Sequence, residues 1–389
     1  MNRNTDFLPF ARPSIGPEEE EAVLRIMRSG WLTTGSEALA FEKEFAQYVG
    51  APFALAVNSA TSGLHLALEA AGIGKGDVVI TSPYTFTSTA AVVRHLGAEL
   101  AFCDTAPGSY NIDPSQLRQL LEKTRNCRAI IPVHIGGLPC DMDAILALGK
   151  RYGCTVVEDA AHAFPVETTR GFAGALGDIG VYSFYATKTI TTGEGGMVVS
   201  ANEKLARRMS LMRMHGIDRA VWDRYTAKKA SWRYQVSEAG FKYNMPDILA
   251  AIGRVQLRRA ETFMNQRKTI AEVYNKAFAG IPGLGLPPVN ANHAWHLYSL
   301  RVDASITGIN RDALIETLAD AGIGASMHFI PLHLMPYYAK RYSLGPEAFP
   351  NALAMFETTL SLPIWQGMGE DNANRVAATV LEAVGSGPR

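Results

Sequence analysis

Short apolar runs alternate with helical patterns between about residues 50 and 200. Amphipathic segments such as 62–72, 114–124 and 143–153 are predicted helices. The runs between them are rich in β-branched and aromatic residues and are predicted strands: FALAV (53–57), DVVIT (77–81), AELAFCD (98–104), RAIIPVH (128–134), CTVVED (154–159), IGVYSFY (179–185) and GGMVVS (195–200). Apolar runs without polar interruptions are typical of strands covered on both faces. The pattern predicts an α/β domain with a doubly wound, mostly parallel sheet.

The pattern changes after residue 240. Residues 245–281 are predicted to be largely helical, and a Pro- and Gly-rich break covers 281–290. Beyond the break we predict a strand over 293–303, a helix over 311–324 and a strand leading into a loop over 325–333. This order predicts a smaller α/β domain beside the large one, with the large domain at 1–255 and the small domain at 256–389.

Composition limits the classes of partner. The 389 residues include 37 Lys+Arg and 37 Asp+Glu, so the formal net charge of zero provides no overall attraction to nucleic acid or to an anionic membrane. No signal-like segment opens the chain and no apolar run reaches the length of a membrane span. The cysteines stand without a CxxC pair or a matching histidine cluster, at Cys103, Cys127, Cys140 and Cys154. We therefore expect a cytoplasmic protein with reduced thiols and no metal site.

Candidate chemistry lies at the ends of the predicted strands, because ligands of open parallel sheets bind at the carboxyl ends of the strands. The segment NSATSG (58–63) follows the first strand and opens a helix. Backbone N–H groups and the hydroxyls of Ser59, Thr61 and Ser62 can bind an anion there. The same residues can equally be an ordinary helix cap and turn.

Two further strand ends add a carboxylate and an amine. Asp159 ends a buried strand and needs a cationic or hydrogen-bonding partner, unless it caps the following helix. Lys188 follows the next strand, after Ser183. A desolvated lysine can present a free amine to an aldehyde, whereas a lysine on an exposed turn has no such role. Phosphate, pyridine nitrogen and aldehyde are the three groups of pyridoxal 5′-phosphate that a protein binds, so this cofactor is predicted.

Several motifs in order carry a resemblance to a known family. NSATSGLHLAL, PYTFTST, VVEDAAHA, SFYATKTITTGEGGMV and GFKYNMPDILAAIG resemble the DegT/DnrJ/EryC1/StrS sugar aminotransferases, which are pyridoxal phosphate enzymes of fold type I. The resemblance extends from FLPFARPSIG and GWLTTG near the start to LSLPIW at 360–365. It implies a large sheet domain that binds the cofactor and a smaller C-terminal α/β domain.

The resemblance also implies roles for individual residues. Lys188 would hold the cofactor covalently and move protons, and Asp159 would pair with the pyridinium nitrogen. The remaining cofactor contacts would come from Thr61, Ser62 and Ser183 at the phosphate, His162 near the ring and Phe86 on its face. An aromatic residue in PYTFTST can also belong to the core.

Residues 240–245 read Gly-Phe-Lys-Tyr-Asn-Met, where many relatives read G-x-N-x-R-M. In the family this segment usually reaches the neighbouring subunit's site. The resemblance therefore implies a homodimer, with Lys242 and Asn244 as further cofactor contacts.

The implied reaction takes an amino group from L-glutamate to a nucleotide-linked 4-keto sugar, for polysaccharide or lipopolysaccharide synthesis. The C-terminal segments most resemble the enzymes that make UDP-4-amino-4-deoxy-L-arabinose, and aminotransferases for UDP-4-keto-6-deoxyhexosamines share much of the framework. Candidates for contact with the sugar nucleotide are Trp31, His328 and His333, each of which can equally be a packing residue.

Three other functions fit this sequence less well. Family members that remove a sugar hydroxyl carry histidine in place of the lysine, so Lys188 favours transamination. A catalytically silent nucleotide-sugar-binding protein would not need an amine beside Asp159. A dinucleotide-dependent oxidoreductase is disfavoured because no G-x-G-x-x-G follows a predicted strand and opens a helix.

Overall fold

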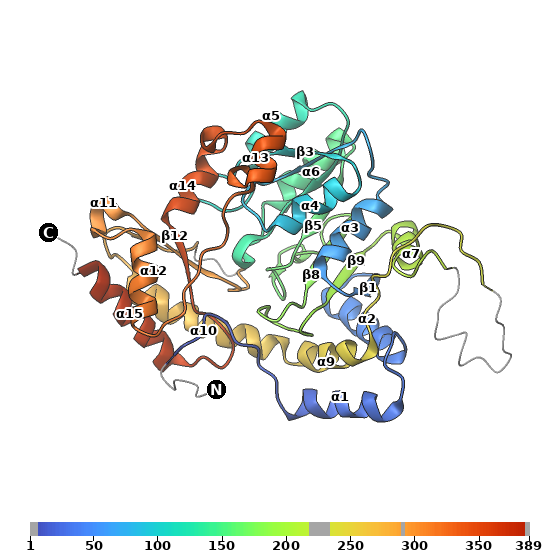
Figure 1. Ribbon diagram of the computed structural model, residues 1–389, viewed down its shortest axis with the longest axis horizontal. Helices are drawn as coiled ribbons and strands as arrows, with labels where there is room; N and C mark the ends of the chain where they lie inside the picture. Colours follow the sequence, from blue (N-terminus) through green and yellow to red (C-terminus); the bar gives the residue numbers. More distant parts are fainter. Residues whose placement is uncertain (1–6, 218–233, 289–291, 386–389) are drawn as a thin grey trace.

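The computed structural model describes residues 7–217, 234–288 and 292–385 (Figure 1). In this part of the chain the main sheet has 7 strands in the order β1-β9-β8-β5-β4-β2-β3. They are β1 (Phe53–Val57), β2 (Val78–Thr81), β3 (Glu99–Phe102), β4 (Cys127–Ile131), β5 (Thr155–Asp159), β8 (Ile179–Ser183) and β9 (Gly196–Ser200). All strands predicted between residues 50 and 200 are confirmed. Only β9 runs antiparallel to its neighbours in this sheet, so the prediction of a mostly parallel α/β fold is also confirmed.

Helices cover both faces of the main sheet. Side chains alternate along the strands: Leu55 and Val57 of β1 join one apolar cluster, and Ala54 and Ala56 join another. The first face is covered by α3 (Ala60–Ala70), α4 (Thr87–His95) and α7 (Glu203–Met212), and the second by α2 (Ser36–Val49), α5 (Pro114–Lys123), α6 (Met142–Tyr152) and α9 (Asp247–Arg258). Burial on both sides explains why the strands read as unbroken apolar runs.

A smaller antiparallel sheet has the order β10-β11-β12, with β10 (Leu284–Gly285), β11 (Tyr298–Val302) and β12 (Thr359–Leu362). It packs with α10 (Ala260–Phe278), α12 (Arg311–Asp320) and α15 (Glu370–Gly385). The strand predicted for 293–303 and the helix predicted for 311–324 are confirmed as β11 and α12. The remaining elements are α1 (Pro17–Ser29), η1 (Ile135–Gly137), β6 (Glu167–Thr168), β7 (Gly171–Phe172), α11 (Ala304–Thr307), η2 (Leu332–Leu334), α13 (Pro336–Tyr342), η3 (Pro346–Ala348) and α14 (Pro350–Thr358).

The strand predicted for 325–333 is wrong. This segment makes one isolated bridge, from Ser326 to Ser361, and is otherwise irregular up to η2. The ladder position beside β11 is taken by β12 instead. The segment then crosses to the large sheet, where the Leu332 N–H donates to the carbonyl oxygen of Pro83 at 2.7 Å. Apart from its one bridge, the segment passes between the two sheets without pairing along either.

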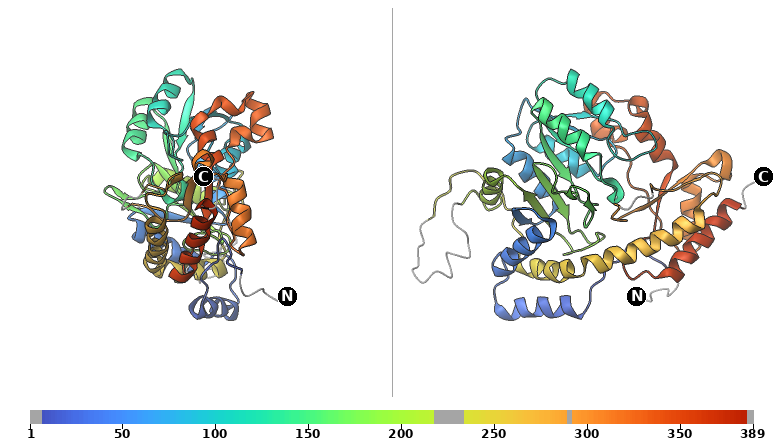
Figure 2. Two further views of the ribbon diagram at one scale, coloured as in Figure 1. Left: turned by 90° about the vertical axis from the view of Figure 1, so that its left-hand side faces the viewer. Right: turned by 180° about the vertical axis from the view of Figure 1, so that it is seen from behind.

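The long helical region predicted over 245–281 consists of α9 and α10, which meet at Arg259. Figure 2 shows the two helices following one another along the length of the molecule. Helix α9 packs on α1 and α2 beside the large sheet, and α10 packs on α15 beside the small sheet. Residue 255 lies inside α9, and Leu8 near the N-terminus packs in the core of the small sheet. The boundary at 255 stays a prediction.

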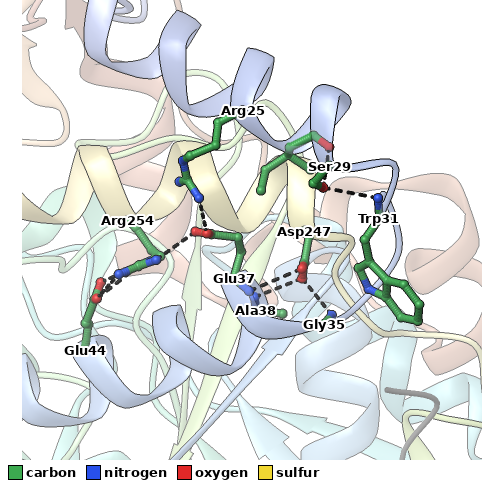
Figure 3. Close-up of polar contacts among 10 residues, drawn as sticks. Arg25, Ser29, Trp31, Gly35, Glu37, Ala38, Glu44, Asp247 and Arg254 are labelled. Atoms are coloured by element: carbon green, nitrogen blue, oxygen red, sulfur yellow. Dashed lines mark hydrogen bonds and ion pairs between the residues drawn. The ribbon is translucent and has the colours of Figure 1, made fainter. Parts of the chain in front are cut away.

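Asp247 joins α9 to the start of α2 (Figure 3). Its buried carboxylate accepts hydrogen bonds from the backbone N–H groups of Gly35 at 2.7 Å, Glu37 at 3.2 Å and Ala38 at 3.0 Å. The N-terminus of α2 thus receives its cap from another helix. A β-carbon at Gly35 would lie 2.8 Å from the Asp247 carboxylate, so the close approach requires glycine there.

We predict that Asp247→Ala lowers the free energy of unfolding by about 2–3 kcal/mol, because buried N–H donors lose an ionised acceptor. Urea unfolding followed by circular dichroism measures the loss. Asp143→Ala is the matched control, since its ion pair with Arg170 is solvent-exposed and is worth about 1 kcal/mol or less. Equal losses in both variants would contradict the role given to Asp247.

Candidate active site

The register of the sheet brings the predicted strand ends to one edge. Gly196, the first residue of β9, is paired with both Val57 at the end of β1 and Ser183 at the end of β8. Asp159 at the end of β5 is paired with Val181. The helix start after β1, the Ser183 hydroxyl and the Asp159 carboxylate therefore lie side by side.

A cavity of about 530 Å³ lies at this edge. It is lined by several residues that the sequence singled out: Thr61, Phe86, Asp159, His162, Ser183, Lys188 and His328. Ser62, Trp31, His333, Lys242 and Asn244 are not among the lining residues. The volume is that of an ordinary small-molecule site.

Asp159 is buried at the cavity wall and is only 4% exposed. Its carboxylate accepts a hydrogen bond from the Thr89 hydroxyl at 2.8 Å and one from the Ala161 N–H at 3.2 Å. Burial raises the pKa of Asp159, while these two donors and the nearby Lys188 act in the opposite direction. The arrangement is suited to a carboxylate that pairs with a cation inside the cavity.

Lys188 is half-buried in the turn that follows β8, where its N–H donates to the carbonyl oxygen of Tyr185 at 2.9 Å. Burial lowers the pKa of its amine to about 7. Asp159 opposes this shift and the guanidinium of Arg267 adds to it. A large fraction of the amine is therefore uncharged at neutral pH, as a nucleophilic lysine requires.

Three histidines line the cavity in their neutral form. Burial, followed by the proximity of Lys188, lowers the pKa of His162 and of His296 well below the ordinary value, and lowers that of His328 to about 4. His162 Nδ1 accepts a hydrogen bond from the Gly136 N–H at 3.3 Å. The rings of His162 and His296 lie 4.4 Å apart, and His162 stacks on Phe329 at 5.8 Å. Planar rings therefore form one wall of the site.

The N-terminus of α3 meets the cavity through Ser59 and Thr61. Ser59 caps the helix by accepting a hydrogen bond from the Ser62 N–H at 3.1 Å. The Ser62 hydroxyl turns back to Asn58 Oδ1 at 2.6 Å, so it serves the turn rather than the cavity. A β-carbon at Gly63 would lie 2.8 Å from Val181, which shows how closely α3 is seated on the sheet.

Lys242 and Asn244 lie beside the end of β1, outside the cavity. Asn244 makes an isolated bridge with Val57 and donates to the Thr34 hydroxyl at 2.6 Å. The exposed Lys242 amine donates to Asn244 Oδ1 at 2.5 Å. Trp31 lies in the same region, with its indole N–H on the Thr34 carbonyl oxygen at 3.3 Å. Lys242 is thus exposed beside the buried Asn244, and both are hydrogen-bonded within this region.

His328 and His333 separate although they are close in sequence. His328 lines the cavity, stacks on Phe10 at 5.1 Å and contacts the Ser361 hydroxyl at 3.0 Å. His333 is buried in η2, where its Nε2 contacts the Pro346 carbonyl oxygen at 3.0 Å. The structure therefore places one of the two candidates at the site.

Sequence reasoning missed several residues of the site: Thr89, His296, Arg267, Glu194 and Phe329. Glu194 and Phe329 line the cavity, and Arg267 is buried at 1% exposure behind it. His296 stands in the strand predicted for 293–303, and a histidine within an otherwise largely apolar stretch was the available signal. Arg267 gave no signal, because an arginine inside a helical pattern normally faces solvent.

In the described ranges no group of three or more His, Cys, Asp and Glu side chains is placed to hold a metal ion. No helix in those ranges is long and apolar enough to cross a membrane.

The site fits pyridoxal phosphate. One cavity presents an amine for the aldehyde, a buried carboxylate for the ring nitrogen, flat side chains for the ring faces, and a helix N-terminus with hydroxyls for the phosphate.

Comparisons with known proteins agree. Residues 13–381 match the model of the DegT/DnrJ/EryC1/StrS aminotransferase family. The spore coat polysaccharide biosynthesis protein SpsC of Bacillus subtilis is 45% identical, over 99% of each chain. The sugar aminotransferase Spr1654 of Streptococcus pneumoniae, solved in PMP and PLP forms, superposes with a TM-score of 0.89 in each form; the PMP form is 29% identical over 97% of this chain and 99% of its own.

PseC of Helicobacter pylori, an aminotransferase of pseudoaminic acid biosynthesis, superposes with a TM-score of 0.90 at 27% identity, over 98% of this chain and 100% of its own. The match extends over nearly the whole length of each relative. The chain therefore belongs to the DegT/DnrJ/EryC1/StrS aminotransferase family and is a sugar aminotransferase that depends on pyridoxal phosphate.

Proposed function

We propose that this enzyme transfers the amino group of L-glutamate to a nucleotide-linked 4-keto sugar and that Lys188 is its catalytic lysine. The observation that carries the proposal is the amine of Lys188, whose pKa burial lowers to about 7 in the cavity that also contains Asp159. When bound, the cofactor supplies an aldehyde that takes up the amino group and a ring that spreads negative charge.

The residues of the cavity then have distinct tasks. Lys188 attaches the cofactor and, when its amine is free, carries the proton that must move during transamination. Asp159 would keep a proton on the ring nitrogen, and the hydrogen bonds from the Thr89 hydroxyl and the Ala161 N–H favour the ionised form of that carboxylate. His162 and Phe86 flank the ring. Thr61, Ser183 and the N-terminus of α3 hold the phosphate.

Two kinds of evidence support the proposed sugar substrate, the descriptions of the relatives and the sequence motifs. SpsC is described as a protein of spore coat polysaccharide biosynthesis and PseC as an aminotransferase of pseudoaminic acid biosynthesis. Both descriptions support a sugar substrate that is used to build glycans. The motif resemblance favours a UDP-4-keto pentose. A UDP-4-keto-6-deoxyhexosamine is the second candidate, because Phe10 and Phe329 give the cavity an apolar wall that suits the methyl group of a 6-deoxy sugar.

A second copy of the chain is part of the proposal. Lys242 is exposed and, with Asn244, lies outside the cavity of its own chain. A homodimer would let this pair reach the phosphate in the partner's site, where a cationic amine is favourable.

The first test is absorbance. Purified enzyme supplied with pyridoxal phosphate should show a visible band that L-glutamate shifts toward the pyridoxamine form. Lys188→Ala should lack the attached-cofactor band and lose activity, because no amine remains to bind the aldehyde. Lys150→Ala, a change at an exposed helix position, is the control and should behave as the unmodified enzyme. An unchanged band in Lys188→Ala would contradict the assignment.

The second test asks which subunit Lys242 serves. Lys188→Ala and Lys242→Ala should each be poorly active, whereas dissociating, mixing and reassembling them should restore about a quarter of wild-type activity, because half of random dimers carry one intact site of two. The dimer itself is checked by sedimentation. No recovery from reassembled dimers would mean that Lys242 acts on its own chain.

The third test separates the sugars. We expect measurable transfer to both a UDP-4-keto pentose and a UDP-4-keto-6-deoxyhexosamine, with kcat/KM higher for the pentose by about 10-fold or more. The two sugars differ at C5 and at C2, and one methyl group alone changes binding by about 1–3 kcal/mol. Phe329→Ala should lower kcat/KM for the 6-deoxy sugar more than for the pentose, because the variant removes part of the apolar wall proposed to contact the methyl group. Turnover of neither sugar would remove the 4-keto sugar assignment and leave the aminotransferase class intact.

A further inference from the structure

His296 contacts the amine of Lys188 from the other half of the molecule. Its Nε2 lies 3.3 Å from Lys188 Nζ, although 108 residues separate the two in the sequence. His296 precedes β11 of the small sheet, lines the cavity and is 6% exposed. The contact is therefore made inside the site and not on its rim.

The other nitrogen of His296 has no hydrogen-bond partner. Nδ1 is buried and unpaired among the residues that the structure describes. Buried N–H groups without an acceptor are rarer in proteins than buried acceptors without a donor. The ring should therefore carry its hydrogen on Nε2, which faces Lys188, and leave Nδ1 bare.

Charges around the pair favour the same state. The other titratable and charged groups that line the cavity around Lys188 and His296, or stand directly behind it, are Asp159, His162, Tyr185, Glu194, Arg267 and His328. Burial and the nearby Lys188 lower the pKa of His296 well below its ordinary value, and Arg267 acts in the same direction. A neutral imidazole with hydrogen on Nε2 can donate only to a Lys188 amine that has a free electron pair.

Arg267 fixes both partners through the backbone. Its guanidinium donates to the carbonyl oxygens of His296 at 3.3 Å and of Thr187, the neighbour of Lys188, at 3.3 Å. Gln366 accepts from Arg267 Nε at 3.1 Å and donates to the Thr189 carbonyl oxygen at 3.3 Å. The turn of Lys188 and the segment of His296 are thus held by the same buried groups.

We propose that His296 is a positioning residue that donates its Nε2 hydrogen to the unprotonated amine of Lys188 and so selects the free amine over the ammonium. The inference rests on the proposed role of Lys188 and explains how the family's lysine is kept reactive in this chain. The hydrogen bond acts whenever the amine is not attached to the cofactor.

The test measures Lys188 itself in the cofactor-free enzyme. Acetic anhydride acetylates only the free amine, and mass spectrometry of the Lys188 peptide gives the extent of reaction as a function of pH. Wild type should show a midpoint near pH 7, the pKa of the amine. His296→Leu should raise the midpoint by about one pH unit, because the neutral amine loses its donor. His296→Gln, which keeps an N–H near the same place, should return it toward the wild-type value.

His293→Asn is the matched control. His293 lies in the same segment, is buried and accepts from the Trp295 N–H at 2.8 Å, an acceptor that asparagine keeps, yet it does not line the cavity. In this variant the pH midpoint of Lys188 acetylation should equal that of the wild type. Near-ultraviolet circular dichroism checks that each variant is folded.

A midpoint that stays or falls in folded His296→Leu would overturn the inference, since a fall means that His296 accepts from the ammonium. Neither result touches the role of Lys188 in binding the cofactor, which the absorbance of Lys188→Ala decides. A wild-type midpoint near the ordinary lysine value of 10.5 would also overturn it.

Discussion

The site depends on burying two groups with opposite requirements in one cavity. Burial favours the neutral form of both, which helps Lys188 and harms Asp159. The structure resolves the conflict by giving hydrogen-bond donors to the carboxylate and a neighbouring guanidinium to the amine. Thr89 and Ala161 serve Asp159, and Arg267 disfavours a charge on Lys188. The hydrogen-bond donors thus favour the charged form of Asp159, and the guanidinium favours the neutral form of Lys188.

The geometry needs both halves of the fold. The large sheet provides Asp159, Ser183 and the Lys188 turn, because its strands end at one edge. The segments that flank the small sheet contribute His296 and His328 to the cavity wall. Arg267, on the helix that runs toward the small sheet, bonds to the carbonyl oxygens of both segments. A packing change between the sheets would therefore alter the chemistry of the lysine as well as the shape of the cavity.

The sequence predicted the features that local pattern determines. Unbroken apolar runs identified the strands of the main sheet, and polar residues at their ends identified Asp159, Ser183 and Lys188 as neighbours. The strand predicted over 325–333 was wrong. The apolar residues of this segment contact the cavity and the large sheet, and neither contact requires the segment to pair as a strand. His296 and Arg267 could not be placed, since their partners are distant in sequence and no periodicity records such contacts.

The charged groups of the cavity bear on the proposed role of Lys242. Among the described lining residues the charged groups are Asp159, Lys188 and Glu194, and the histidines there are neutral. Neutral imidazoles and hydroxyls suit a sugar, whose hydroxyl groups need donors and acceptors but no counter-charge. A phosphate is further stabilised by a cation, and the exposed Lys242 lies outside its own cavity. In the proposed homodimer, one subunit would perform the proton chemistry and the Lys242 amine of the other would help to neutralise the phosphate.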